Sequence, residues 1–320
     1  MRGRPGVALV ALLLLAAGVR LRWFTGLVVG DDVVYSTIAA DRLSGTVHFY
    51  NVHQCRPGFL LPVMGSTALL GPGEFSLVLY NLLCSLGLVA ALAVLARRCF
   101  GDPAGVLAGA LAALHPNLSR FATECHTDTP VALWLTLAVL ALHAATTSAR
   151  PRPLLALAGL LVGWAYLHKE HAVFLLPFVA VLPRALGLRW TWLLPFALPF
   201  AGVVAAETAG YAVLTDNPLK RWEMVRHWHA NHYMAEQYPD VASLLWRLFL
   251  DLPLRLLAPW NGLVFPLAAL AAWRPLRDRV PAARWIAGWF AATTRWSSCW
   301  IRRSILLPRI PATSRATSPA

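Results

Sequence analysis

Long apolar runs recur along the chain, each separated from the next by a short polar or basic stretch. A helix needs roughly 20 residues to cross the hydrocarbon core of a bilayer. Runs of about this order predict an all-α integral membrane protein, a polytopic bundle of about eight or nine transmembrane helices. The apolar runs behind this prediction are residues 7–24, 75–96, 103–116, 130–146, 154–167, 172–186, 190–214 and 259–273.

Arginine residues fall in every second connection between these runs. If the N-terminus is cytoplasmic, the basic connections also face the cytoplasm, as the positive-inside rule requires. They contain Arg97, Arg98, Arg150, Arg152, Arg184, Arg189, Arg274, Arg277 and Arg279. The chain is then a multi-pass protein of the cytoplasmic (inner) membrane, and the bias towards Ala, Leu, Arg and Pro suggests a bacterial source. The outer connections are residues 25–74, 117–129, 168–171 and 215–258.

Two segments of the long outer loops mix apolar residues with Asp and Arg at helical spacing. Residues 33–43 and 242–257 are therefore predicted to be helices that lie on the membrane surface. After about residue 293 the character changes, because Arg, Ser, Thr and Pro dominate and no run is long enough to span. We expect residues 1–292 to form one transmembrane domain and residues 293–320 to be a disordered or aberrant tail.

Composition agrees with the membrane assignment. The 320 residues are 58% hydrophobic and 13% charged, whereas soluble domains carry about 25% charged residues. The net charge of +13 comes from basic residues at the ends of apolar runs. This distribution indicates membrane topology and not a nucleic-acid partner.

Two adjacent carboxylates, Asp31 and Asp32, directly follow the first apolar run. Adjacent like charges raise one another's pKa, and ionisable groups at the membrane edge are candidates for function. Asp is also favoured at helix starts, so the pair could simply cap the surface helix that follows.

Further polar side chains fall on the same predicted side of the membrane: Arg56 in the first outer loop, His126 and Asp128 before the fourth apolar run, and Lys169 with Glu170 in a tight turn. All are expected to face one outer cavity. Alternatively, Asp128 caps a helix whose first turn holds Pro130, and the Lys169–Glu170 pair is a solvated turn.

The last outer loop holds His229 and His232, which share a helix face at a spacing of three. A metal could bind there, but no closely spaced carboxylate completes a known zinc pattern. No cofactor is therefore expected. The nearby residues Trp222, Trp228 and Tyr233 suit interfacial anchoring or a contact with a lipid headgroup.

The order of short motifs resembles the GT-C superfamily of membrane glycosyltransferases, in particular its protein O-mannosyltransferase and aminoarabinose-transferase branch. The run Asp31-Asp32-Val33-Val34-Tyr35 is similar to that family's Asp-Glu-x-x-Tyr element, with Asp in place of Glu. Further resemblances follow in order: Arg56-Pro57-Gly58, Asn81, Arg97 to Gly101, His115-Pro116, Asp128-Thr129-Pro130, and Gly159 to Gly163 leading to Lys169-Glu170.

The resemblance implies transfer of a sugar from a polyprenyl-phosphate donor to an acceptor hydroxyl or amine at the outer face. Asp31 would be the general base or would orient the acceptor, and cations would stabilise the leaving phosphate. Family members usually run longer, so the chain resembles a truncated member. The resemblance makes Asp31, Asp32 and Asp128 candidate catalytic residues, and Tyr35, Arg56, His126, Lys169 and Glu170 candidate substrate-binding residues.

Two other readings stay open at the level of sequence. A multispan transporter or flippase for a lipid or small solute would use intramembrane charges along a path, although the polar residues here gather on one face. An inactive, truncated fragment is the second. The sequence does not select the sugar or decide whether the acceptor is a protein, a lipid or a polysaccharide.

Overall fold

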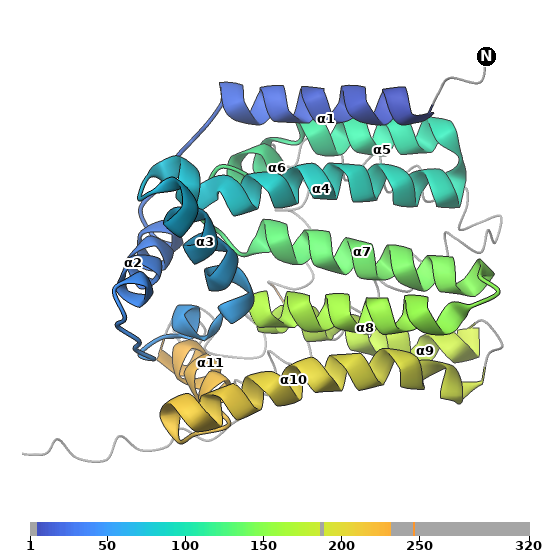
Figure 1. The fold of residues 1–320 in the computed structure, drawn as a ribbon. Helices are drawn as coiled ribbons and strands as arrows, with labels where there is room; N and C mark the ends of the chain where they lie inside the picture. The colour runs from blue at the N-terminus through green and yellow to red at the C-terminus, as the bar shows by residue number, and fades with distance from the viewer. Residues whose placement is uncertain (1–4, 186–188, 232–245, 247–320) are drawn as a thin grey trace, which may run out of the picture.

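The computed structural model describes residues 5–185, 189–231 and 246, and every regular element among them is helical. This confirms the predicted class, a polytopic helical membrane fold (Figure 1). The α-helices are α1 Pro5–Arg22, α2 Asp31–Leu43, α3 Pro57–Leu70, α4 Glu74–Phe100, α5 Asp102–Leu114, α6 Pro116–Phe121, α7 Asp128–Thr147, α8 Pro151–His168, α9 Leu176–Ala185, α10 Leu194–Thr215 and α11 Lys220–Asn231. The 3-10 helices are η1 Val52–Cys55, η2 Glu170–Leu175 and η3 Trp190–Leu193.

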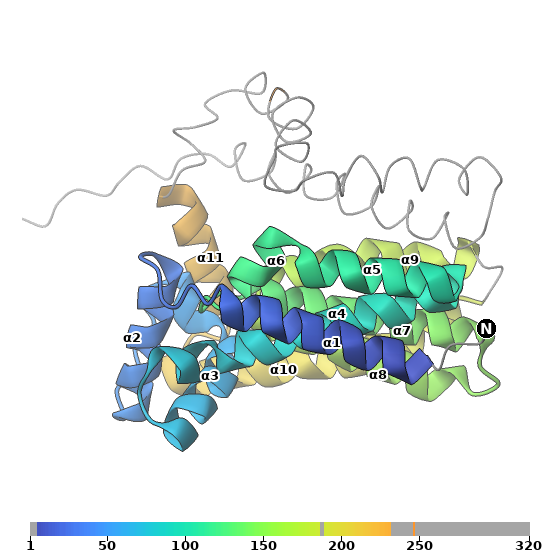
Figure 2. The same cartoon turned by 90° about the horizontal axis from the view of Figure 1, so that it is seen from above.

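The longer helices run side by side, and the shorter ones gather at one end of the bundle (Figures 1 and 2). Helix α4 packs against α5 and α7, α7 packs against α8, and α8 packs against α10. Helices α2, α3 and α11 lie across the end where α1, α8 and α10 finish and α4 and α7 begin (Figure 1). We call this the cap end.

The predicted apolar runs within the described residues fall on helices of the bundle. In the part of the chain that the structure describes, three helical segments are long and apolar enough to cross a membrane: Glu74–Phe100, Asp128–Thr147 and Trp190–Thr215. Helix α5 has 13 residues, which extend only about 20 Å at 1.5 Å per residue. The predicted span 259–273, surface helix 242–257 and tail 293–320 lie outside the described residues.

The first outer loop, predicted as residues 25–74, contains more helix than its pattern indicated. The predicted surface helix over residues 33–43 is confirmed as α2, which begins two residues earlier at Asp31. Helix α3 was not predicted, because its 14 mostly apolar residues are too few to span a bilayer and show no polar face. Pro57 opens α3 at a position where its missing N–H costs nothing, and α3 packs against α2, α4 and α8.

The described basic residues of the connections predicted to be cytoplasmic lie at the end opposite the cap. Arg97 and Arg98 occupy the last turn of α4, and Arg152 occupies the first turn of α8 (Figure 1). Their common position agrees with the alternation seen in the sequence. That this end is cytoplasmic remains a prediction.

Helices α8 and α10 approach closely because glycine faces the contact. A Cβ on Gly159 would meet the carbonyl oxygen of Phe196 at 2.1 Å, and one on Gly163 would meet Val203 at 2.9 Å. Small residues permit such close contacts between membrane helices. The contact brings the C-terminal half of α10 beside the end of α8.

A buried arginine joins α1 to α4 and α5. The Arg20 side chain is fully buried and donates to Ser85 Oγ at 2.7 Å and to the Ala113 carbonyl at 3.1 Å. It also donates to the carbonyl of Ala112 at 3.4 Å, which has no helical donor because residue 116 is a proline. Arg20 thereby satisfies two of the C-terminal carbonyls of α5.

Candidate active site

Five side chains from separate segments meet at the cap end and form what we call the acid–imidazole cluster: Asp31, His53, His126, Asp128 and Lys169. One oxygen of the Asp31 carboxylate lies 3.3 Å from His53 Nε2, and the other lies 3.6 Å from His126 Nε2. The carboxylates of Asp31 and Asp128 are 41% and 47% exposed. Both are therefore open to an incoming molecule.

Asp31 owes its position to the start of α2. Gly30 precedes it with φ 122°, a conformation that favours glycine, and Asp31 is the first residue of the helix, where a carboxylate suits the helix dipole. A hydrogen bond from His53 lowers the pKa of Asp31 to about 2, and the Coulombic effects of His53, His126 and Arg56 add to this. The carboxylate is accordingly ionised at neutral pH.

Asp32 has a different environment although it is the next residue. Its side chain is buried and accepts a hydrogen bond from the backbone N–H of Val28 at 2.9 Å. Burial raises the pKa of Asp32, although hydrogen bonds from the backbone N–H groups of Val28 and Cys125 act to lower it. The two adjacent carboxylates therefore point to different partners, Asp31 to imidazoles and Asp32 to the backbone.

The second half of the acid–imidazole cluster lies at the start of α7. His126 Nδ1 is 3.4 Å from the Asp128 carboxylate, and its ring stacks on Phe121. Lys169 Nζ donates to Asp128 Oδ1 at 2.6 Å from the turn after α8. His126 therefore bridges Asp31 and Asp128, and Lys169 pairs with the Asp128 carboxylate.

A second group of charges lies deeper at the same end. We call it the buried ion-pair cluster: Arg56, Glu170, Glu207 and Arg221. Glu170 lies 3.9 Å from a guanidinium nitrogen of Arg56 and 4.0 Å from one of Arg221, and Arg221 also pairs with Glu207. Their side chains are 8% exposed or less. Two positive and two negative groups balance, so the cluster is neutral overall.

Tyrosines accept hydrogen bonds from both arginines. Arg56 donates to the hydroxyl of Tyr35 from α2, and Arg221 donates to the backbone carbonyl of Tyr166 at 2.6 Å. Burial would raise the pKa of Glu170, but its hydrogen bond with His171 and the charges of Arg56 and Arg221 hold it well below the usual range. Glu170 is therefore an ionised carboxylate inside the protein.

The Lys169–Glu170 turn rests on a buried aromatic support. His168 is fully buried, with Nε2 2.7 Å from the hydroxyl of Tyr80 and Nδ1 2.7 Å from the carbonyl oxygen of Trp164. Gly58 of α3 passes close by, since a Cβ there would lie 2.7 Å from the His168 ring. This packing fixes where the next two residues emerge.

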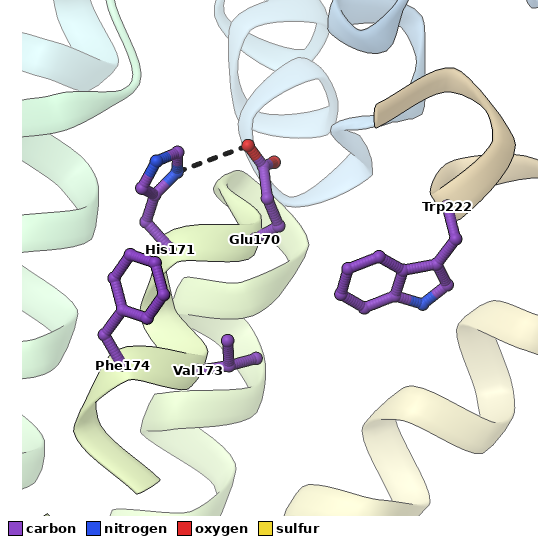
Figure 3. Close-up of a pocket in the computed structure, with 5 residues that line it drawn as sticks. All are labelled: Glu170, His171, Val173, Phe174 and Trp222. Carbon is purple, nitrogen blue, oxygen red and sulfur yellow. Dashed lines mark ion pairs between the residues drawn. The ribbon is translucent and has the colours of Figure 1, made fainter. Parts of the chain in front are cut away.

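A small pocket opens beside Glu170. Figure 3 shows Trp222 of α11 facing residues of η2 across it, with a contact of 3.2 Å between His171 Nδ1 and Glu170. Its lining residues are Glu170, His171, Val173, Phe174 and Trp222.

The predicted site residues meet in two places. Asp31, His126, Asp128 and Lys169 meet in the acid–imidazole cluster, while Tyr35, Arg56 and Glu170 lie in or against the buried ion-pair cluster. Asp32 lies beside the first group but pairs with the backbone. Sequence reasoning missed His53, Glu207 and Arg221.

These omissions have identifiable signals. His53 stands three residues before Arg56 in a polar run. Glu207 is a lone acid within an apolar helix, a position that needs a partner. Arg221 follows Lys220 in a basic stretch beside Trp222, where nothing in the sequence separates a buried arginine from an exposed one.

Among residues 5–185, 189–231 and 246 there is no group of three His, Cys, Asp or Glu side chains placed to hold a metal ion. The histidine pair considered from the sequence lies outside this set. His232 lies outside the described residues, and the side chain of His229 is not described.

Comparison with known proteins gives one family. Residues 57–206 match the family described as dolichyl-phosphate-mannose-protein mannosyltransferase. No curated protein and no solved structure matches the chain. The matched segment covers α3 to α9 and most of α10. It begins just after Arg56 and ends just before Glu207.

Proposed function

Because residues 57–206 belong to the dolichyl-phosphate-mannose-protein mannosyltransferase family, the chain is a membrane glycosyltransferase of the GT-C kind, and we propose its reaction. It transfers a sugar from a polyprenyl-phosphate donor to an acceptor hydroxyl or amine at the outer face of the membrane. The observation that carries this proposal is the ionised, accessible carboxylate of Asp31 between two imidazoles.

Asp31 binds and orients the acceptor. An ionised carboxylate accepts a hydrogen bond from the attacking hydroxyl, and takes its proton as the new bond to the anomeric carbon forms. A pKa of about 2 makes Asp31 a weak base, so proton transfer comes late, when the acceptor oxygen has already lost electron density. The bond between the anomeric carbon and the phosphate oxygen breaks, and its electron pair leaves with polyprenyl phosphate.

Lys169 stabilises the phosphate that leaves. Of the two cations proposed from the sequence, Arg56 is buried and already paired with Tyr35 and Glu170. Lys169 is partly exposed and paired with the exposed carboxylate of Asp128. A phosphate group can compete for such a lysine, and cations placed where negative charge develops lower the barrier.

The remaining site residues position these two groups. His126 lies between Asp31 and Asp128. It therefore sets the distance between Asp31, which binds the acceptor, and the Asp128–Lys169 pair, where the phosphate binds. Asp32 holds the chain that enters α2 through Val28. Arg56 and Tyr35 tie α2 to the N-terminus of α3 from within.

The outer face is the side that the topology favours. Basic connections lie at the end opposite the cap, and such connections face the cytoplasm. A polyprenyl chain can remain in the bilayer while its headgroup reaches the cap end, which explains why a membrane fold carries the site. The acceptor class stays open between a protein, a lipid and a polysaccharide.

The experiment is a transfer assay with the full chain in proteoliposomes that contain undecaprenyl phosphate carrying mannose, glucose or galactose. We expect a labelled sugar to pass from at least one donor to membrane or protein acceptors, and no transfer from nucleotide sugars. Movement of donor lipid between leaflets without any transfer would instead favour the flippase reading.

A further inference from the structure

The imidazole of His126 lies between two carboxylates, and its contacts define which nitrogen carries the proton. The backbone N–H of Asp128 donates to His126 Nδ1 at 3.3 Å, so Nδ1 is the acceptor in the neutral ring and the proton is on Nε2. Nε2 faces the Asp31 carboxylate at 3.6 Å. Neutral His126 therefore points its N–H at Asp31 and only a lone pair towards Asp128.

The Asp128 carboxylate divides its two oxygens between two residues. Oδ1 accepts a hydrogen bond from Lys169 Nζ at 2.6 Å, and Oδ2 lies 3.4 Å from His126 Nδ1. While Nδ1 is unprotonated, Oδ2 meets a lone pair and Lys169 is the cation that holds the carboxylate. A proton on Nδ1 turns the contact with Oδ2 into an ion pair. Asp128 then has a second cationic partner, and its hold on Lys169 weakens.

The charge balance of these groups depends on the same proton. Asp31, Asp128 and Lys169 sum to one net negative charge when His126 is neutral, and to zero together with His126 when the ring is protonated. A lipid phosphate is itself negative and is repelled by the excess charge of the first state. A bound phosphate in turn favours the protonated ring. Affinity for the phosphate must therefore fall as pH rises and the proton is lost.

The other charges around the ring either favour the same proton or already have partners. Asp32 is bonded to the backbone, and its negative charge attracts a proton to the ring. Glu124 pairs with Arg120 at 2.5 Å. Arg56 is held within the neutral buried ion-pair cluster. The exposed carboxylates and Lys169 therefore dominate the balance at the ring.

The second imidazole of the cluster is less suited to take up a proton. His53 is 5% exposed, its Nε2 faces Asp31 at 3.3 Å, and its Nδ1 has no hydrogen-bond partner among the described residues. A proton added there would leave a buried N–H without an acceptor, which is costly. His126 is 21% exposed, and its Nδ1 already faces a carboxylate. Its ring also stacks on Phe121, which holds both nitrogens in place.

We propose that His126 is a proton-operated switch at the phosphate site. Uptake of one proton by Nδ1 gives Asp128 to His126, releases Lys169 and strengthens the binding of the donor's phosphate. This inference rests on the proposed role of Lys169 and adds its regulation: the enzyme binds its donor more tightly as the medium at the cap end becomes more acidic.

The test measures equilibrium binding to the full chain in nanodiscs of phosphatidylcholine, a neutral lipid that adds no surface potential. The probes are undecaprenyl phosphates that carry radiolabelled mannose, glucose or galactose. Each is a phosphodiester with one constant charge, unlike a phosphate monoester, whose second pKa is about 6. Histidines ordinarily change charge between about pH 5 and 8. The wild type should bind at least one probe about tenfold more tightly at the acid end of this range, a usual size for coupled sites.

Two variants separate the switch from a loss of structure. In His126→Asn the side chain can still accept the backbone N–H two residues on but cannot take up a proton. It should bind the probe equally at both ends of the range, with the affinity of the wild type at about pH 8. Asp128→Asn frees Lys169 without a proton and should bind about tenfold more tightly than the wild type at about pH 8, a gain that misfolding cannot produce. His48→Asn, an exposed histidine of the first outer loop, is the control and should keep the wild-type dependence.

Other results overturn defined parts. Wild-type binding that does not change with pH, a dependence that survives in His126→Asn, or weaker binding by Asp128→Asn at about pH 8 would each refute the switch. Transfer in the proteoliposome assay would then leave the proposed function standing. Proton-linked binding without any transfer would overturn the proposed reaction and leave the switch. If no probe binds at any pH and nothing is transferred, both proposals fail.

Discussion

The two charge clusters at the cap end contain the same kinds of side chain and differ in what surrounds them. Asp31 and Asp128 are 41% and 47% exposed, whereas Glu170 and Arg221 are 8% and 2% exposed. An exposed pair is weakly bound because water competes for it. A buried pair is held because separating it would leave an uncompensated charge.

This difference in exposure suits the two clusters to different roles. Lys169 can leave Asp128 for a substrate phosphate at small cost, and Asp31 can accept a bond from an acceptor without losing one to the backbone. Arg56 and Arg221 cannot exchange partners in this way. We therefore propose that the exposed cluster carries the chemistry, and that the buried cluster holds α2, α3, η2, α10 and α11 in place.

The largest expected effect comes from Asp31→Asn. An amide cannot take the acceptor proton, so the rate of transfer should fall about 100- to 10,000-fold, the usual contribution of a general base. The measurement is kcat in the proteoliposome assay. Asp41→Asn, an exposed aspartate of the same helix, should change the rate less than twofold; a similar loss in both variants would break the distinction.

Arg221→Leu tests the buried cluster. Removing one partner of a buried pair costs about 3–5 kcal/mol, because Glu207 loses its cation and Glu170 keeps only Arg56. The variant should unfold at clearly lower temperature or denaturant in detergent. Arg226→Leu on the exposed face of α11 should not, and adding Glu207→Gln to Arg221→Leu should recover part of the loss.

Arg20→Leu shows whether burial alone gives an arginine a structural role. Its hydrogen bonds to Ser85 and to the end of α5 should be worth about 1.5–3 kcal/mol, the range for bonds from a charged group. Thermal unfolding measures the change, with exposed Arg22→Leu as control. A variant as stable as the wild type would show that α5 does not need this cap.

The smallest effect is a pH shift in His53→Ala. The hydrogen bond from His53 is the main cause of the low pKa of Asp31, about 2 against the ordinary 3.8. Because the folded pKa is lowered, the ionised form is retained as pH falls through 3.8 and is lost only near 2. Without His53 the acid limb of the rate profile should move up towards 3.8. His48→Ala, an exposed histidine of the same loop, should leave the profile unchanged.

The fold was largely predictable because membrane helices are recognisable in a sequence as long apolar runs between polar connections. The described runs of the predicted bundle are helical, and the surface helix at residues 33–43 is present as α2. Helix α3 escaped prediction since a short, uniformly apolar segment carries no periodic signal. Its role, to place Arg56 and to pack on His168, depends on contacts far apart in the sequence.

The candidate site was predictable as a side of the membrane but not as two clusters. Topology alone places Asp31, Asp128 and Lys169 at one end. It does not say that Asp32 turns inward to the backbone while Asp31 turns to imidazoles. Pairing of Arg221 with Glu207 joins α11 to α10, 14 residues apart in the sequence, and no local motif reports it.

The most direct test of this division compares Asp31→Asn with Arg221→Leu by transfer rate per folded molecule. The folded fraction is taken from unfolding curves and the rate from the proteoliposome assay. The two-cluster account predicts that folded Asp31→Asn is at least about 100-fold slower, whereas folded Arg221→Leu keeps its rate within about tenfold and loses mainly stability. Full activity in Asp31→Asn, or an equal loss of rate per folded molecule in both variants, would contradict it.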